Sequence, residues 1–372
     1  MKLSLVQLKN AIATYVDENK ISVDTFTATR NNTVGLLDTI GKIFTIPSNF
    51  VDKLAIFDAE FLSYGKTIEE WKSDLILPED FDASGSGALS PHRSTYRPVD
   101  FSFTLGRKKI PQTIDNNDVE RAVHNQGQFV EIIAEKYKVI TDSETAMIYQ
   151  IKRQMLGVLI ARCIAQMDAS NATAWTDVAH STLNALFKEN AGATDTYILV
   201  KPYAQGGASN FADAVAKGYL IKMDLVSELD KPVDTSTGEA FITQVKKDIE
   251  IAGDLSEGHS LNGNTLGVSD KDLVLLVLQG IRPVLDVAVM AGAFHEDKVA
   301  LPAEVISVRD FGDDNSGAYA ILMDRRGAKL FNTYRAVREN VNGDGDFLNL
   351  FAHSEWTAHV SRNVFVKVYK PE

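Results

Sequence analysis

The segment PEDFDASGSGALSP (residues 78–91) is the most unusual stretch of the chain, and it lies between two strand-like segments. Residues 67–77 carry isolated apolar side chains among charges, and residues 99–105 alternate apolar with polar side chains, as a half-buried strand does. Gly, Ser and Pro at this density indicate a loop. Structureless loops of about 20 residues are uncommon inside compact domains. We therefore expect two strands and a long tip, used as a lid or laid on another molecule.

The longest helical pattern follows this unit. The sequence from Thr141 to Glu144 has the spacing of a capping box, and apolar residues then repeat on one stripe to about Met167. At 1.5 Å per residue, the predicted helix is about 35–40 Å long. It is long enough to be a spine for the fold.

The remaining patterns mix helices and strands. Helices are predicted over 3–16, 118–123, 129–139 and 173–187, behind a second capping box at 236–239, and from Pro283. Strands are predicted at 197–200, 273–278 and 303–311, with a hairpin over 318–331 and one final strand over 356–368, interrupted at Arg362. The regular alternation of a doubly wound sheet is missing, so the predicted class is α+β.

Composition sets outer limits on the protein class. The chain has 372 residues, 45% apolar and 24% charged, which is ordinary globular usage for two or three structural units. Its net charge of −12 argues against a protein whose main task is gripping nucleic acid phosphates. No apolar run approaches the ~20 residues of a membrane-spanning helix, and the N-terminus lacks the pattern of a signal peptide. The single cysteine, Cys163, fits a reducing cytoplasm.

No catalytic spacing stands out. The chain contains neither G-x-x-x-x-G-K-[ST] nor G-x-S-x-G, and its acidic clusters near residues 310–314 and 344–346 lack the calcium-loop pattern. Cys163 lies in an apolar helical run and is interpreted as a buried structural thiol. We therefore expect no catalytic residue, cofactor or metal, a combination that favours assembly over catalysis.

Three segments, in this order, resemble the major capsid proteins of tailed bacteriophages, especially short-tailed phages of the phi-29 type. GKTIEEW (65–71) is similar to the start of that family's extended hairpin loop. KIPQTI (109–114), continuing through QGQF (126–129), is similar to the return strand that leads into the spine helix. FAHSEWTAHVSRN (351–363) is similar to the last peripheral strand. The three segments bracket most of residues 60–372.

The resemblance implies a Hong Kong 97-type capsid fold. Its parts would be an N-terminal arm (1–55), an extended loop (65–113), a peripheral domain with the spine helix (56–64, 114–169 and 316–372) and an axial domain (170–315). The implied function is structural, not enzymatic: hexamers and pentamers would build the icosahedral head shell around double-stranded DNA. The resemblance further implies assembly in the host bacterial cytoplasm, a separate scaffolding protein, a portal, weak inner-surface contact with the packaged DNA, and no membrane.

The extended loop supplies the candidate interface residues. An isolated two-stranded ribbon is marginal in water, so we expect a partner to cover the alternating apolar face of residues 99–105. Basic residues of the loop are candidate ion-pair donors to acidic neighbours, which would set orientation more than affinity. The candidates are Lys66, Glu69, Glu70, Trp71, Arg93, Arg97, Phe101, Phe103, Arg107, Lys108 and Lys109.

Two other functions stay open at this point. An encapsulin-type cellular nanocompartment shares the implied architecture, and cargo enzyme co-purifying with small empty shells would favour it. An α+β enzyme with Gly85–Gly87 in a lid is the other. A pocket with converging acids of perturbed pKa would favour that enzyme.

Overall fold

The computed structural model describes residues 50–62, 65, 68–73, 96–100, 102–115, 126–167, 186–188, 196–199, 216, 220–263, 267–293, 301, 303–312 and 317–371. These residues belong to one compact unit, Asn49–Glu372. The helices predicted at 3–16 and 118–123 lie outside the described residues, as do the N-terminal arm before residue 50 and the tip between 74 and 95.

The spine helix α4 (Gln126–Met167) is continuous over 42 residues, about 63 Å at 1.5 Å per residue. The predicted start at Thr141 and the separate helix before it are therefore wrong. The hydroxyls of Ser143 and Thr145 donate to the carbonyls four residues earlier, at 2.7 and 2.9 Å, which is how such residues are accommodated inside a helix. Glu144 is buried instead of capping, because its side chain meets the neighbouring sheet.

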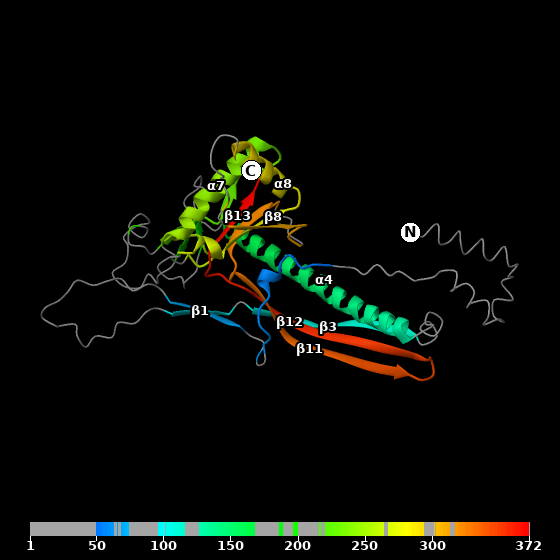
Figure 1. The fold of residues 1–372 in the computed structure, drawn as a ribbon. Helices are drawn as coiled ribbons and strands as arrows, with labels where there is room; N and C mark the ends of the chain where they lie inside the picture. The colour runs from blue at the N-terminus through cyan, green and yellow to red at the C-terminus, as the bar shows by residue number, and fades with distance from the viewer. Residues whose placement is uncertain are drawn as a thin grey trace, which may run out of the picture. The chain divides into compact units, whose positions relative to one another are not determined.

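An antiparallel sheet in the order β11-β12-β3 lies beside α4 (Figure 1). Its strands are β3 (Ser102–Asp115), β11 (Ala328–Asn342) and β12 (Phe347–Val360). Leu350 and Ala352 pack in one cluster with Ile140 of α4. Because side chains alternate along a strand, the residues between them face away from the helix. The sheet thus has one face toward α4 and one opposite face.

A second sheet of five strands has the order β7-β13-β10-β8-β9. The strands are β7 (Val226–Glu228), β8 (Leu273–Leu278), β9 (Glu304–Val308), β10 (Ala320–Asp324) and β13 (Val366–Lys370). One face shares a core with α4, and the other is covered by α7 (Thr235–Gly253) and α8 (Ile281–Ala293). Burial on both faces explains the uninterrupted apolar run of β8, which confirms that predicted strand.

Two predicted elements are wrong because the chain changes sheets. β10 and β11 flank a tight turn, closed by the 2.8 Å bond from the amide of Gly327 to the carbonyl of Asp324, but they pair in different sheets instead of forming a hairpin. The predicted final strand is likewise two strands, and Arg362 lies in the crossover between β12 and β13. Because β10 and β13 join the sheet of β8, the predicted domain boundary at 316 does not divide the sheets.

A third sheet has the order β4-β5-β6, from Leu186–Lys188, Thr196–Leu199 and Leu220–Met223. β5 confirms the strand predicted near 197–200. β4 replaces the end of the predicted helix 173–187, because apolar residues such as Phe187 suit a paired strand as well as a helix face. The rest of that prediction lies outside the described residues.

The cap of α7 is also displaced from the prediction. Asp234, two residues before the predicted box, accepts the amide of Thr237 at 2.9 Å. The Thr237 hydroxyl returns the contact, since the Asp234 amide donates to it at 3.1 Å. Threonine therefore takes the place that glutamate holds in the usual box.

The segment before the ribbon is fixed between α4 and β11. This segment includes the short 3-10 helix η2 (Ala55–Phe57). Another short 3-10 helix, η3 (Asp270–Asp272), lies elsewhere in the chain, directly before β8. The fully buried Lys152 of α4 pairs with Asp52 and Asp58, each at 2.5 Å. Backbone amides of residues 59 and 62 then bond the outer edge of β11 at residues 330 and 332.

Candidate assembly surface

The ribbon consists of β1 (Glu69–Ser73) and β2 (Tyr96–Asp100), paired antiparallel with Glu69 opposite Asp100. No other described strand pairs with either. The predicted order of strand, long tip and strand is confirmed, because the segments on both sides of the tip are extended and paired with each other. The return strand stops at residue 100, however, since β3 begins at Ser102 and pairs with β12.

The predicted ribbon, residues 65–113, is therefore too long. Leu105 packs against the main core of its own chain, so the expectation that a partner covers the whole face of residues 99–105 is wrong at that position. The pattern misleads because one alternating run continues across a change of sheet. From here "the ribbon" means residues 69–100.

Glu70 fastens the base of the ribbon to the body of its own chain. Its Oε1 accepts from Ser361 Oγ at 2.7 Å and from Asn363 Nδ2 at 3.1 Å, and its Oε2 lies 3.2 Å from His359 Nε2. Burial raises the pKa of Glu70, but the hydrogen bonds from these three side chains outweigh it and hold the pKa below the ordinary value. The carboxylate is thus a fixed acceptor between β1 and the crossover after β12.

Arg107 and Lys109 lie on the face of the three-stranded sheet opposite α4. Arg107 Nε is 3.4 Å from Glu355 Oε2, and its guanidinium stands 3.9 Å above the ring of Tyr334. Lys109 Nζ lies 5.1 Å from the ring centroid of Phe351. Register shifts in both strand pairs bring Arg107 and Tyr334 beside Glu355. The ion pair expected of Arg107 with a neighbour is therefore formed within the chain.

Lys108 lies on the α4 side of the same sheet, opposite Ser354 in the register. Beside it, Glu144 of α4 accepts from Ser354 Oγ at 2.6 Å and from Arg335 at 2.8 Å. This buried carboxylate joins the middle of the helix to the central strand β12 and the edge strand β11. Sequence reasoning missed it because Glu144 was assigned to a cap.

The other candidates fall in three groups. Lys66, Arg93 and Phe101 lie outside the described residues. Trp71 and Arg97 occupy strand positions of the ribbon, as does Glu69, and Phe103 lies in β3 opposite Ala358. Phe103 therefore belongs to a strand of the body of the chain and not to the ribbon.

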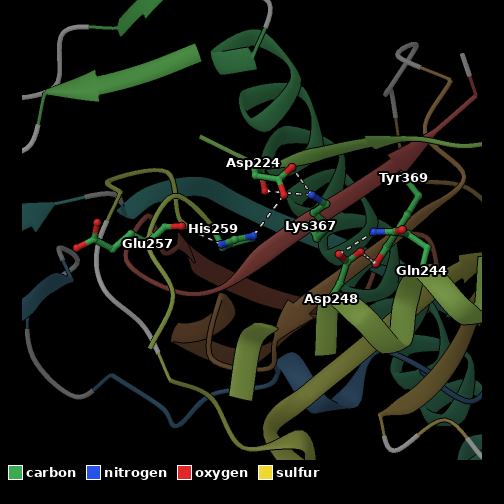
Figure 2. Close-up of polar contacts among 7 residues, drawn as sticks. All are labelled: Asp224, Gln244, Asp248, Glu257, His259, Lys367 and Tyr369. Carbon is green, nitrogen blue, oxygen red and sulfur yellow. Dashed lines mark hydrogen bonds and ion pairs between the residues drawn. The ribbon is translucent and has the colours of Figure 1, made fainter. Parts of the chain in front are cut away.

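A polar network lies between β13 and α7 (Figure 2). Lys367, 3% exposed, donates to Asp224, whose Oδ2 is 3.4 Å from His259 Nε2. Next to it, Tyr369 Oη donates to Asp248 at 2.6 Å, and Gln244 donates to the same carboxylate at 3.0 Å. The alternating pattern VKVYK (366–370) predicts a strand, but the sequence does not show which acidic residues contact its Lys and Tyr side chains.

The two acids of this network have pKa values shifted in opposite directions. Burial raises the pKa of Asp224, but the nearby His259 ring and the charge and hydrogen bond of Lys367 outweigh it and hold the pKa well below the ordinary value. Burial raises the pKa of Asp248, only partly offset by the charge of Lys367 and by Tyr369. The part of the network around Asp248 is buried and joins the sheet to α7, whereas the Asp224 carboxylate is half exposed.

The remaining described residues were considered for a reactive thiol, a metal site and a membrane-spanning helix. Burial raises the pKa of Cys163 to about 12, which keeps the thiol protonated and confirms its interpretation as structural. In the part of the chain that the structure describes, no three or more His, Cys, Asp or Glu side chains are grouped to hold a metal. None of the described helices combines the length and apolar character of a membrane-spanning segment.

Comparisons with known proteins agree on one architecture. A family model described as Phi29-like phage major capsid protein matches residues 6–366. The capsid structure of Staphylococcus phage Andhra is 11% identical with a TM-score of 0.54, covering 89% of this chain and 88% of that one. A structure described as head fiber and inner core protein gp22 of native bacteriophage P68 is 12% identical with a TM-score of 0.55, covering 89% and 87%. A search of curated proteins found no match. The expected Hong Kong 97-type fold is confirmed.

Proposed function

The chain belongs to the Phi29-like phage major capsid protein family, so it is a structural protein of the phage head shell, and we propose that its ribbon joins neighbouring copies in that shell. Each copy lays the ribbon over an adjacent copy of the same ring, and its N-terminal arm, residues 1–55, over another. Rings of six and five copies then close the icosahedral shell around double-stranded DNA.

One observation carries this proposal. The ribbon is a two-stranded sheet with no third described strand, held to its own chain through Glu70 at its base. Two-stranded ribbons are marginal in water, so a stable ribbon needs a covering surface. A neighbouring copy supplies that surface in every position of a closed shell.

The other partners follow from the same role. We propose a separate scaffolding protein, a portal at one vertex, and assembly in the host bacterial cytoplasm. The net charge of −12 supports only weak contact of the inner surface with packaged DNA, since like charges repel. Such a shell holds its genome without adhering to it.

A deletion within the ribbon tests the proposal. Removing residues 80–97 takes away the tip and two positions of β2, and leaves the described sheets of the body intact. We expect a soluble, folded chain that no longer forms shells in negative-stain images. The matched control replaces residues 80–95 by a Gly-Ser segment of equal length, which keeps the connection and is expected to fail in the same way.

Normal particles from both variants would contradict the ribbon's role. The family match favours a phage shell over the two alternatives considered from sequence, an encapsulin-type compartment and a lid-bearing enzyme. Small shells that co-purify with a cargo enzyme would reverse that preference for the compartment.

A further inference from the structure

Residues 50–62 connect the N-terminal arm to the body of the chain, and we name them the arm root. The root makes its apolar contacts through Leu54 and Phe57, which are both fully buried in the main core. A tight turn joins the two, closed by the 3.1 Å hydrogen bond from the Phe57 amide to the Leu54 carbonyl. Because apolar burial is non-directional, these contacts hold the root to the body but do little to fix its position along α4.

Two lysines from different elements hold the root by directed bonds. Lys152 of α4, which is fully buried, pairs with Asp52 and Asp58 on either side of the turn, each at 2.5 Å. Lys329 of β11 donates to the carbonyl of Ile56 inside the turn, at 3.0 Å. One cation thus binds the carboxylates of the root and the other binds its backbone. We name these five residues the clamp.

Stability alone does not account for a buried charge at Lys152. The next turn of α4 is apolar on this side, since Met155 and Leu156 are buried in the same core. Replacing a buried ion pair by apolar residues is often neutral or stabilising, because ions lose their water on burial. One carboxylate already neutralises the ammonium, yet two bind it, and Asp58 stays 55% exposed. Fixing one arrangement out of several is the best-attested use of such buried charges.

We propose that the clamp fixes the position of the arm root on α4, so that the arm leaves every copy at the same point. This inference rests on the proposed role of the arm in joining copies. Phe50, just before the clamp, packs edge-on against Tyr149 of α4 with ring centroids 5.3 Å apart, which extends the same alignment toward the arm. A closed shell repeats each contact between identical copies, so it needs one common point of departure.

A double variant that removes the buried charges and keeps the packing tests this role. Lys152→Met with Asp52→Asn puts an unbranched apolar side chain in place of the ammonium. The asparagine retains an oxygen for the Leu54 amide, which Asp52 accepts at 2.8 Å. Asp58 is half exposed, so water can replace its lost partner.

A second variant and a matched control accompany it. Lys329→Met removes only the bond to the Ile56 carbonyl and leaves the buried ion pairs intact. The control, Lys247→Met with Asp270→Asn, makes the same chemical changes as the double variant at exposed positions of α7 and η3.

Three measurements separate the position of the root from the stability of the body. The thermal unfolding midpoint reports stability, sedimentation of assembled full-length chain reports shell yield, and amide hydrogen exchange reports the root at Ala59 and Leu62, whose amides bond β11. We expect the double variant to keep its midpoint, to exchange about tenfold faster at these two amides and to yield about tenfold fewer shells. Lys329→Met should change exchange and yield in the same direction but less. Exchange in β8 and all properties of the control should match the unaltered chain.

Normal shell yield from the double variant would overturn the proposal, and so would unchanged exchange at Ala59 and Leu62. If the midpoint of the double variant falls, Lys329→Met decides, because it leaves the buried pairs in place. Normal yield from Lys329→Met would then overturn the proposal, and reduced yield at an unchanged midpoint would support it.

Deleting residues 1–48 separates the clamp from the proposed role of the arm. The deletion ends before the first described residue, so it leaves the clamp itself intact. Normal shells from the deletion would remove the role of the arm. Loss of shells on deletion, beside normal yield from both clamp variants, would remove only the clamp.

Discussion

At the scale of single residues, the five-stranded sheet holds two carboxylates with opposite pH behaviour. Asp224 is ionised and held by Lys367 and His259, so its folded-state pKa lies below the unfolded value. Asp248 is buried and has a raised pKa. The first contributes stability that is present above about pH 4 and is lost as the pH falls toward its folded-state pKa. The second opposes folding when it is ionised.

Asp248→Asn should therefore stabilise the protein at neutral pH. The folded chain binds a proton at Asp248 more tightly than the unfolded chain does, so ionisation costs stability as the pH rises through the raised pKa. We expect a gain in the free energy of unfolding near pH 7 and none near pH 3, where the carboxyl is protonated. Denaturant unfolding across this pH range measures it, with the exposed Asp270→Asn as the control. A gain that grows toward low pH would contradict the assignment.

Asp224→Ala and Lys367→Met form a second test in the same network. Removing Asp224 leaves the nearly buried Lys367 without its carboxylate, and an uncompensated buried charge is strongly destabilising. Lys367→Met removes the charge with its need for a partner, and leaves Asp224 half exposed to water. Thermal and urea unfolding should rank the methionine variant as the more stable. The reverse order would show that Asp224 does not serve to neutralise Lys367.

At the scale of elements, Glu70 decides how firmly the ribbon is seated. Glu70→Ala removes the acceptor of Ser361 and Asn363 and the contact with His359. We expect amide hydrogen exchange in β1 and β2 to become about tenfold faster, since charge-assisted hydrogen bonds are worth about 1.5–3 kcal/mol. Exchange in the buried strand β8 should not change.

Glu70→Gln is the matched variant, because an amide oxygen still accepts from one neutral donor. Its exchange rates should lie between those of the unaltered chain and of Glu70→Ala. Equal rates of amide hydrogen exchange in β1 and β2 in all three proteins would contradict the role of Glu70 in holding the ribbon to the body of the chain.

The elements also show what sequence can reveal. Continuous burial identifies β8, and the Gly, Ser and Pro of the tip mark the ribbon. Helix α4 was predicted too short because Thr141 and Glu144 have the spacing of a capping box, whereas Glu144 bonds Ser354 of the neighbouring sheet. Side-chain periodicity reports burial but not partner, so it could not show that residues 99–105 or 356–368 change sheets.

At the scale of the whole molecule, the family resemblance supplied what local patterns could not. The order of three segments led to the capsid fold, whereas the contacts that hold that fold together join residues far apart in the chain. Glu70 with Asn363 and Glu144 with Ser354 are examples. A single sequence shows no such pairs, so the anchor of the ribbon at Glu70 could be found only in the structure.

The central claim is that the ribbon rests on another copy of the chain. A high-resolution electron cryomicroscopy reconstruction of shells assembled from the full-length protein tests it most directly. The account predicts that density for residues 74–95 leaves its own body beyond Glu70 and lies against the adjacent copy. Density that places these residues against the sheets of their own chain would contradict it.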